Sequence, residues 1–368
     1  MEKQIIGIDA SRSNSKQKTG TEYYSYELIK NIIKFDEFNF RLYSKEPLTY
    51  LDKKSNVENR VMRFPRLWSQ VRLSAEIYQN PPAVLFEPAH TIPLYHGKKT
   101  VITLHDVGFK YFPELYTPLE RIYHNYCMDF SVRHATKIIA ISNSTKNDLI
   151  KLYGAQKEKI SVIYHGFDNQ RFFISKTKPS EEIKSLQPYI FFIGRIEAKK
   201  NIKNLVKAFG RLKQNIKIKE KLVLAGRSGY QYEEIKKEIK LLPNQIQQDV
   251  IELGYVEDEK VGELTRHASL FAFPSRFEGF GMPLVETMAC GVPIVASNTT
   301  SIPEIVDNAA LMCDPDDIEG FAKNMSLVIQ NENIKDDLVK KGLKRSDKFS
   351  WEKCARETLS VIESVIDN

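Results

Sequence analysis

The stretch YIFFIGRIEAKKN, residues 189–201, carries the pattern that predicts the fold of this 368-residue chain. Its apolar run, residues 190–193, predicts a buried strand that ends at Gly194-Arg195, and Asn201 is the expected N-cap of the helix that follows. A strand, a short loop and a helix recur along the whole chain. This alternation predicts a mostly parallel sheet covered by helices on both faces, and therefore an α/β protein with doubly wound, Rossmann-like domains.

The predicted strands form two sets separated by the polar segment 169–187, whose composition is typical of an exposed connection. We therefore expect two domains, residues 1–170 and 171–350, followed by a helix over residues 351–368. The strands are expected at residues 4–8, 40–43, 83–86, 101–104, 138–141 and 160–164 of the first domain, and at 190–193, 222–225, 250–253, 270–273 and 292–296 of the second.

The composition excludes several classes of protein. Hydrophobic residues make up 42% of the chain, and no apolar run approaches the ~20 residues of a transmembrane helix. The N-terminus leads into a strand rather than a signal peptide, so we expect a cytoplasmic location. The four cysteines are far apart and form no C-x-x-C pair, which argues against disulfides and a zinc site; they are Cys127, Cys290, Cys313 and Cys354.

The positive charge lies mainly in the first domain. Residues 1–170 hold 24 Lys and Arg against 18 Asp and Glu, whereas the rest of the chain is nearly balanced. Such an excess suits an anionic membrane surface or a phosphorylated acceptor, and it is also ordinary for a domain of this size. No basic aromatic or recognition-helix pattern is present, so nucleic acid is not an expected partner.

A second stretch, FEGFGMPLVE at residues 277–286, combines two carboxylates with a glycine turn and a helix start. Gly279 and Gly281 permit positive φ and a close backbone approach to a ligand, just before Pro283 opens a helix whose free amides suit an anion. Glu278 in the loop is expected to face the reacting centre. Glu286, one turn into the helix, is suited to accept hydrogen bonds from vicinal hydroxyls.

Carboxylates beside a phosphate site require cations, and Arg195 and Lys200 are the candidates for a diphosphate clamp. Parallel sheets bind ligands at the carboxyl ends of their strands, so residues 194–195, 225–227 and 274–276 should point toward one cleft. His105 follows the predicted strand 101–104 and should project from the corresponding edge of the first domain. The groove between the domains is therefore the expected active site.

These motifs resemble those of the family-4 retaining glycosyltransferases, which have the GT-B fold. The resemblance rests on the Gly-Arg strand end, the Lys-Asn helix start and the E-x7-E motif, together with the upstream segments 103–107, 112–114, 139–142 and 162–168. It is closest to the bacterial mannosyltransferase-like branch that builds O-antigen and other surface polysaccharides. It implies an acceptor-side first domain, a nucleotide-sugar-binding second domain and a terminal helix that crosses back to the first.

The resemblance also implies roles for individual residues. The catalytic group would comprise His105, Arg195, Lys200 and Glu278. The donor-binding group would comprise Gly20, Asp106, Gly194, Gly279, Phe280, Gly281, Met282 and Glu286. Glu286 would bind the ribose, Glu278 would lie near the donor sugar and its phosphate, and Asp106 would position its loop. No metal or cofactor is implied, and none of the predicted strands ends in a D-x-D loop.

Two positions depart from the family pattern. The loop after the first strand keeps only Gly20 where the family usually has two glycines, so Thr19 or Thr21 would have to supply a hydroxyl there. His165 stands where the family often has Asn before Gly-x-Asp. The contacts of both positions are therefore open.

The segment 60–73 interleaves four arginines with Phe64, Leu67, Trp68 and Leu73. One interpretation is contact with a membrane or a lipid-linked acceptor. The favoured interpretation is a helix whose apolar stripe packs on the sheet while its arginines stay in water.

The leading hypothesis is a retaining transferase that moves a hexose, most plausibly mannose from GDP-mannose, to a sugar hydroxyl of a growing glycan. The alternatives are a UDP-glucose- or UDP-GlcNAc-dependent transferase, a nucleotide-sugar epimerase or a phosphorylase on the same architecture, and a non-catalytic subunit that binds nucleotide sugar. The expected partners are the nucleotide-sugar donor and a glycan acceptor, with a lipid-linked glycan and peripheral contact with the inner membrane as further expectations.

Overall fold

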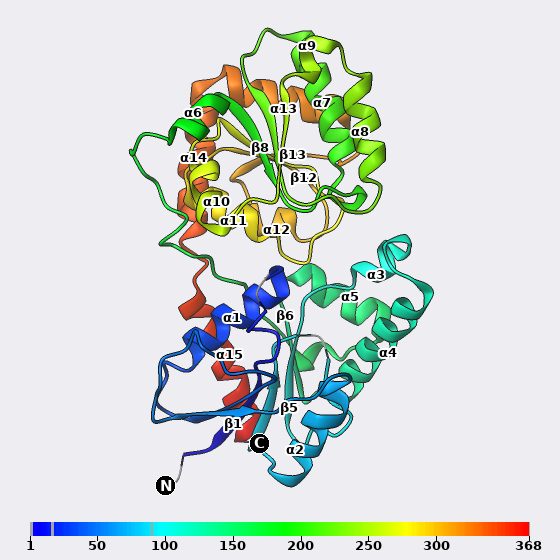
Figure 1. The fold of residues 1–368 in the computed structure, drawn as a ribbon, viewed down its shortest axis with the longest axis vertical. Helices are drawn as coiled ribbons and strands as arrows, with labels where there is room; N and C mark the ends of the chain where they lie inside the picture. Colours follow the sequence, from blue (N-terminus) through cyan, green and yellow to red (C-terminus); the bar gives the residue numbers. More distant parts are fainter. Residues whose placement is uncertain (1–2, 16–17, 90, 368) are drawn as a thin grey trace. The chain divides into compact units, whose positions relative to one another are not determined.

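The computed structural model describes residues 3–15, 18–89 and 91–367, and the other residues, Met1 and Glu2 of the expected N-terminal lead among them, lie outside the described part. The chain forms two compact units. One extends to Gly166 and resumes at Ser350, and the other is the continuous segment Phe167–Phe349. Each unit is a sheet with helices on both faces (Figure 1). The expected α/β architecture of two doubly wound domains is confirmed.

The sheet of the first unit has, within the described residues, seven parallel strands in the order β3-β2-β1-β4-β5-β6-β7. They are β1 (Ile5–Asp9), β2 (Asn39–Ser44), β3 (Val57–Val61), β4 (Val84–Glu87), β5 (Thr100–Leu104), β6 (Lys137–Ala140) and β7 (Ile160–Val162). The main helices of this unit are α1 (Gly20–Ile32), α2 (Ser74–Gln79), α3 (Gly108–Tyr111), α4 (Pro118–His134), α5 (Asn143–Tyr153) and α15 (Trp351–Ile366). Strands β1, β4 and β5 lie at the centre and are almost entirely buried.

The sheet of the second unit has, over the described residues, six parallel strands in the order β10-β9-β8-β11-β12-β13. They are β8 (Tyr189–Ile193), β9 (Lys221–Ala225), β10 (Val250–Gly254), β11 (Leu270–Phe273), β12 (Ile294–Ser297) and β13 (Ala310–Cys313). The helices are α6 (Glu181–Leu186), α7 (Ile202–Asn215), α8 (Tyr232–Leu241), α9 (Asn244–Gln247), α10 (Asp258–Arg266), α11 (Met282–Ala289), α12 (Ile302–Val306), α13 (Ile318–Gln330) and α14 (Glu332–Ser346).

The predicted strands are all present, with shifts of a few residues at their ends, but two further strands were not predicted. Strands β3 and β13 each lie at an edge of a sheet. β3 has the sequence VENRV and is largely exposed, so it carries no continuous apolar run. β13 has only four residues, most of them partly exposed. Edge strands need fewer apolar residues, and their sequence signal is correspondingly weak.

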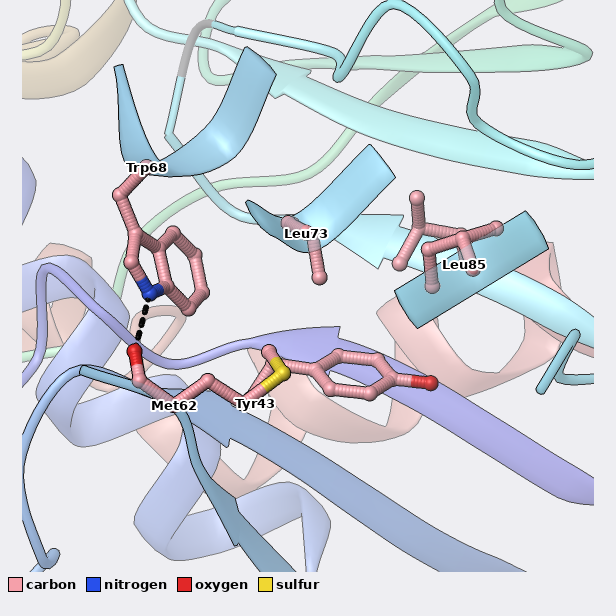
Figure 2. Close-up of a cluster of buried hydrophobic side chains, with 6 residues drawn as sticks. Tyr43, Met62, Trp68, Leu73 and Leu85 are labelled. Atoms are coloured by element: carbon pink, nitrogen blue, oxygen red, sulfur yellow. Dashed lines mark hydrogen bonds between the residues drawn. The ribbon is translucent and has the colours of Figure 1, made fainter. Parts of the chain in front are cut away.

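The predicted helix over residues 60–73 is wrong. Arg60 lies within strand β3, residues 62–67 form a loop, and the helical part begins at Trp68 with the π-helical turn Ser69–Leu73, which continues into α2. Trp68 is the anchor of this segment, because its indole Nε1 donates a 2.6 Å hydrogen bond to the carbonyl of Met62 (Figure 2). The buried cluster around it consists of Tyr43, Met62, Trp68, Leu73, Ile77 and Leu85.

The cysteines are free, and three of them are buried. Among the described residues, no helix combines the length and the apolar character that crossing a bilayer requires.

Candidate functional site

The backbones after β8 and β9 lie close together because a glycine follows each strand. Gly194 and Gly226 have φ values of 147° and 140°, which are strained for any other residue. The Gly226 amide donates to the Gly254 carbonyl, and a Cβ on Gly226 would lie 1.8 Å from the Gly194 carbonyl oxygen. These two glycines therefore allow the loops after β8 and β9 to pack backbone against backbone.

Lys200 and Glu278 form the central ion pair at this edge. Lys200 ends the 3-10 turn Ala198–Lys200, and its Nζ lies 2.5 Å from Glu278 Oε1. The two side chains are only 18% and 11% exposed, and Lys200 Nζ also lies 5.8 Å from the centre of the Phe273 ring. The sequence separates these residues by 78 positions. The fold thus joins a cation from the β8 loop to a carboxylate from the β11 loop.

The loop that carries Glu278 is held by hydroxyl groups from the segment after β12. The Glu278 amide donates to Thr300 Oγ1 at 3.1 Å, and Ser301 Oγ donates to the carbonyls of Glu278 and Phe280 at 3.0 Å each. Gly281 follows with φ of 94° at the N-cap of α11. These contacts fix the backbone of residues 278–280 just before Met282 begins the helix. They therefore also fix the point from which the Glu278 side chain extends.

Glu286 lies on α11 and is 9% exposed. Burial raises the pKa of its carboxyl to about 7, although the positive charge of Arg171 opposes the shift. Asp258 and Asp168 add to the shift, since their negative charges disfavour a further carboxylate. Glu286 is therefore a buried carboxyl surrounded by one cation and two acidic groups.

Arg195 does not join the Lys200–Glu278 pair in this structure. Its side chain is 63% exposed, and its Nε lies 4.0 Å from Glu197 Oε2. The expected side-chain cap by Asn201 is also absent. Asn201 does occupy the N-cap position of α7, but its backbone is left-handed and its Nδ2 donates to the Pro315 carbonyl at 2.6 Å. Its amide ties the β8 loop to the segment after β13, a contact that local capping rules do not predict.

His105 lies at the carboxyl edge of the first sheet, but it is buried. Its Nε2 forms a 2.8 Å hydrogen bond with the Pro88 carbonyl, and its ring packs edge-to-face on Tyr24. His165 packs against the same tyrosine, and burial lowers its pKa well below the usual value. Asp106 accepts a 2.7 Å hydrogen bond from the Gly108 amide, which holds the turn that opens α3.

Gly20 is not in a loop, as was expected, but is the first residue of α1. Thr19 is the N-cap, and a capping box pairs it with Glu22: the Thr19 amide donates to the Glu22 carboxylate at 3.1 Å, and the two side chains are also in contact. The short polar sequence around Gly20 thus starts a helix, because the Thr-x-x-Glu spacing satisfies the first amides.

Asp9 and Glu87 are polar residues that the sequence reasoning missed. They end the adjacent strands β1 and β4 and are 6% and 1% exposed. Burial raises the pKa of both carboxyls, and that of Glu87 is raised well above its usual value. The signal that could have found them is a carboxylate at the end of each of two otherwise apolar strands.

Within the described part of the chain, no three His, Cys, Asp or Glu side chains are grouped so as to hold a metal ion.

Two family models together match most of the chain. Residues 39–171 match the model described as Glycosyltransferase Family 4, and residues 173–345 match the model described as Glycosyl transferases group 1.

Among curated proteins, the chain is similar to the O-antigen chain mannosyltransferase B of Escherichia coli. The two are 28% identical over 372 residues, which covers 93% of this chain and 95% of that protein. The O-antigen chain mannosyltransferase RfbU of Salmonella typhimurium is 27% identical over 228 residues, covering 62% of this chain and 60% of its own length.

Solved structures share the fold at lower identity. The sucrose-phosphate synthase of Thermosynechococcus elongatus superposes with a TM-score of 0.76 at 15% identity, covering 99% of both chains. Anabaena HepE, solved in complex with UDP and glucose, gives a TM-score of 0.74 at 19% identity, covering 99% of this chain and 100% of its own.

Proposed function

Since this chain belongs to family 4 of the glycosyltransferases, which are retaining enzymes of the GT-B fold, we propose that this hexosyltransferase transfers mannose from GDP-mannose to a sugar hydroxyl of a growing glycan. The observation that carries the proposal is the Lys200–Glu278 pair, a partly buried cation and carboxylate 2.5 Å apart at the carboxyl edge of the second sheet. Parallel sheets bind nucleotides at this edge.

In the proposed mechanism, Lys200 stabilises the leaving diphosphate. Negative charge grows on that group as the glycosidic bond breaks, and a fixed cation that binds it better in the transition state lowers the barrier. Lys200 would then share its ammonium group between the phosphate and Glu278. Arg195 is exposed and can turn toward the same phosphate. The acceptor hydroxyl passes its proton to the departing phosphate oxygen and attacks on the face that the diphosphate leaves.

The other donor contacts follow from the same edge. Glu286 accepts from the ribose hydroxyls, and the backbone at Gly194, Gly279, Gly281 and Met282 approaches the diphosphate and the sugar, with Phe280 packed beneath. In the first unit, His105 contacts the sugar or the acceptor, Asp106 holds the turn that opens α3, and Gly20 begins α1 beside the donor. For His105, this role requires the buried ring to become accessible when substrate binds.

Mannose is supported by the relatives at 27–28% identity, whose names are those of O-antigen mannosyltransferases. The competing donor is UDP-glucose, with which Anabaena HepE was solved, but that protein is only 18% identical. The proposal therefore includes a guanine nucleotide, a glycan acceptor, and a cytoplasmic location with peripheral contact to the inner membrane.

Calorimetric titration with GDP and UDP, without added metal, tests the donor. Tighter binding of GDP supports the proposal, whereas tighter binding of UDP overturns the mannosyl assignment in favour of a glucose or N-acetylglucosamine donor. Binding of neither overturns the nucleotide site. Glu286→Ala should weaken binding of the preferred nucleotide, whereas Lys200→Ala should mainly lower turnover; variants that both work like the wild type contradict these roles.

Product analysis then distinguishes transfer from the alternatives. A transferase releases free nucleoside diphosphate only when an acceptor glycan is added. With GDP-mannose as donor, the glycan product keeps the α-configuration of the donor sugar. Release of an epimerised nucleotide sugar would identify an epimerase. Donor binding without turnover over varied acceptors would identify a non-catalytic subunit.

A further inference from the structure

The loops that carry Lys200 and Glu278 are both attached to one short segment, residues 315–316. This segment lies between the edge strand β13 and helix α13. In the second sheet, β12 separates β13 from β11, and both β12 and β11 separate it from β8. The attachment therefore reaches along the carboxyl edge and joins loops whose strands are not neighbours of β13.

The first attachment is to the residues that follow Lys200. Asn201 is buried, and its Nδ2 donates to the Pro315 carbonyl at 2.6 Å. Three residues further along α7, Asn204 Nδ2 lies 3.3 Å from the same carbonyl and donates to Asp316 Oδ1 at 3.0 Å. Since Asn201 is the next residue after Lys200, these bonds fix the backbone from which the Lys200 side chain extends.

The second attachment is to the loop that carries Glu278. Arg276 lies two residues before Glu278, and its Nη2 pairs with Asp316 Oδ1. The same carboxylate oxygen accepts from Asn204. The Arg276 amide also donates to the Lys199 carbonyl at 3.0 Å, so the two loops touch each other as well as their common support. Asp316 thus holds side chains from both loops on one oxygen atom.

The 315–316 segment is itself held at both ends. The Asp316 amide donates to Asp314 Oδ1 at 2.8 Å, and Asp317, the N-cap of α13, accepts from the Gly320 amide at 2.8 Å. Helix α13 in turn packs against α7 (Figure 1). The segment is therefore a fixed support, and the two loops bonded to it share one reference point.

The pair of Asp316 with Arg276 is exposed, whereas the pair that it adjoins is not. Asp316 and Arg276 are 65% and 37% exposed, and an ion pair at such a position contributes little to stability. Lys200 and Glu278 are mostly buried. A cation at an active site is effective only if it is held where charge develops during the reaction. The exposed pair is therefore placed to affect the geometry of the site more than the stability of the unit.

We propose that Asp316 is a positioning residue, which holds the loops of Lys200 and Glu278 at the spacing that transfer requires. The effect on transfer rests on the proposed function, whereas the coupling of the two loops does not. When the diphosphate displaces Glu278 from Lys200, that ion pair no longer joins the loops. The bonds to Asp316 then keep the Lys200 ammonium group beside the leaving phosphate, where negative charge grows.

Steady-state transfer from GDP-mannose tests the role in the reaction. Asp316→Ala should lower kcat about tenfold and change the donor KM less than about twofold, because the groups that bind the ground state are intact. It should unfold at nearly the urea concentration of the wild type. Arg211→Met/Glu319→Ala is the matched control, since it removes an exposed 3.2 Å ion pair that joins α7 to α13 but neither loop. The control should keep the kcat of the wild type.

A double-mutant cycle tests whether Arg276 acts through Asp316. Arg276→Met should lower kcat about as much as Asp316→Ala, and the double variant should be no slower than either, because all three lose the same link. Losses that multiply would contradict the link, and an unchanged kcat in Asp316→Ala would overturn the positioning role. Tighter nucleotide binding by Asp316→Ala would overturn it too, by showing that Asp316 withholds Arg276 from the phosphate.

Hydrogen exchange of the nucleotide-free protein tests the coupling without any transfer. Peptides covering residues 196–201 and 275–281 should exchange at least about threefold faster in Asp316→Ala than in the wild type, and at the wild-type rate in the Arg211/Glu319 control. Equal exchange in Asp316→Ala and the wild type would overturn the coupling. If the wild type transfers no sugar from GDP-mannose, the proposed function fails, and the exchange rates still decide whether Asp316 couples the loops.

Discussion

At the scale of single residues, the pairing of Lys200 with Glu278 is the feature on which the site depends. Both side chains are mostly removed from water, and a buried charge without a partner is costly. The pair therefore keeps a cation in place at the sheet edge before any nucleotide arrives. In the same geometry, Glu278 and the diphosphate compete for the ammonium group of Lys200. The diphosphate must displace the carboxylate through its larger negative charge.

Lys200→Ala should lower turnover about a hundredfold and should lower the free energy of unfolding by about 2 kcal/mol, because Glu278 loses its partner. The double variant Lys200→Ala/Glu278→Ala should recover much of the stability and none of the activity. Urea unfolding and initial rates measure the two effects. A single variant as stable as the wild type would show that the pair contributes no stability.

Glu286 is a pH-sensitive residue by virtue of its burial. Its pKa is about 7 in the folded protein, against 4.5 for a free glutamate side chain, so the folded state binds the proton more tightly. The carboxyl therefore contributes stability below about pH 4.5, and that contribution is lost as the pH rises through 7.

Without nucleotide, the wild type should lose on the order of 3 kcal/mol of stability relative to Glu286→Gln between pH 4.5 and pH 8. The glutamine variant keeps the size of the side chain but cannot ionise, so it isolates this carboxyl from every other titration. Denaturant unfolding across the range measures the difference. Parallel curves for the two proteins would mean that Glu286 is not buried as the structure has it.

At the scale of elements, the ends of the central strands carry the site, and glycines decide how closely those ends approach. Gly226 is the most restricted of them, since a Cβ there would meet the Gly194 carbonyl at 1.8 Å. Gly154, at the C-cap of α5, has a left-handed backbone as well, but a Cβ there would meet nothing within 4 Å. A substitution at Gly226 therefore tests a steric clash together with backbone strain, whereas one at Gly154 tests backbone strain alone.

Gly226→Ala should lower the free energy of unfolding by at least about 3 kcal/mol, through a clash with fixed backbone in addition to strain. Gly154→Ala should lower it by about 1 kcal/mol, through strain alone. Chemical denaturation of both variants checks the ratio. Similar losses would indicate that the loops after β8 and β9 can move apart at little cost.

At the scale of the whole molecule, the two units differ in how the chain builds them. The second is one continuous segment, whereas the first is completed by α15, which follows the second unit in sequence. α15 packs on α1, and Trp351 stacks on His165 and contacts Tyr24. A Cβ on Gly166 would meet the Trp351 amide at 2.1 Å, so this glycine allows the helix to begin against the β7 loop.

A chain that stops after Phe349 should therefore lose the cooperative unfolding transition of the first unit and keep that of the second. Scanning calorimetry measures the transitions, and the preferred nucleotide should raise only the one that remains. If the truncated chain keeps both transitions, α15 is not required for the first unit.

The sequence by itself determined the fold class and the set of residues from which the candidate site is built. Apolar runs ending in glycine or a charged residue predicted most of the strands, because central parallel strands are buried on both faces and must be apolar. The helix expected over residues 351–368 is present at Trp351–Ile366, and the capping box at Thr117 is a local pattern that marks the start of α4 at Pro118. The edge strands β3 and β13 were missed, because an exposed strand does not need that pattern.

Only the tertiary structure decided which of the candidate residues meet. Lys200 and Glu278 are 78 positions apart, and their contact depends on β8 and β11 being neighbours in the sheet. Burial is likewise a property of the packed unit: it raises the pKa of Glu286 and encloses His105, while it leaves Arg195 exposed. Local rules describe what a residue can do, but distance and dielectric environment are set by segments that are remote in the sequence.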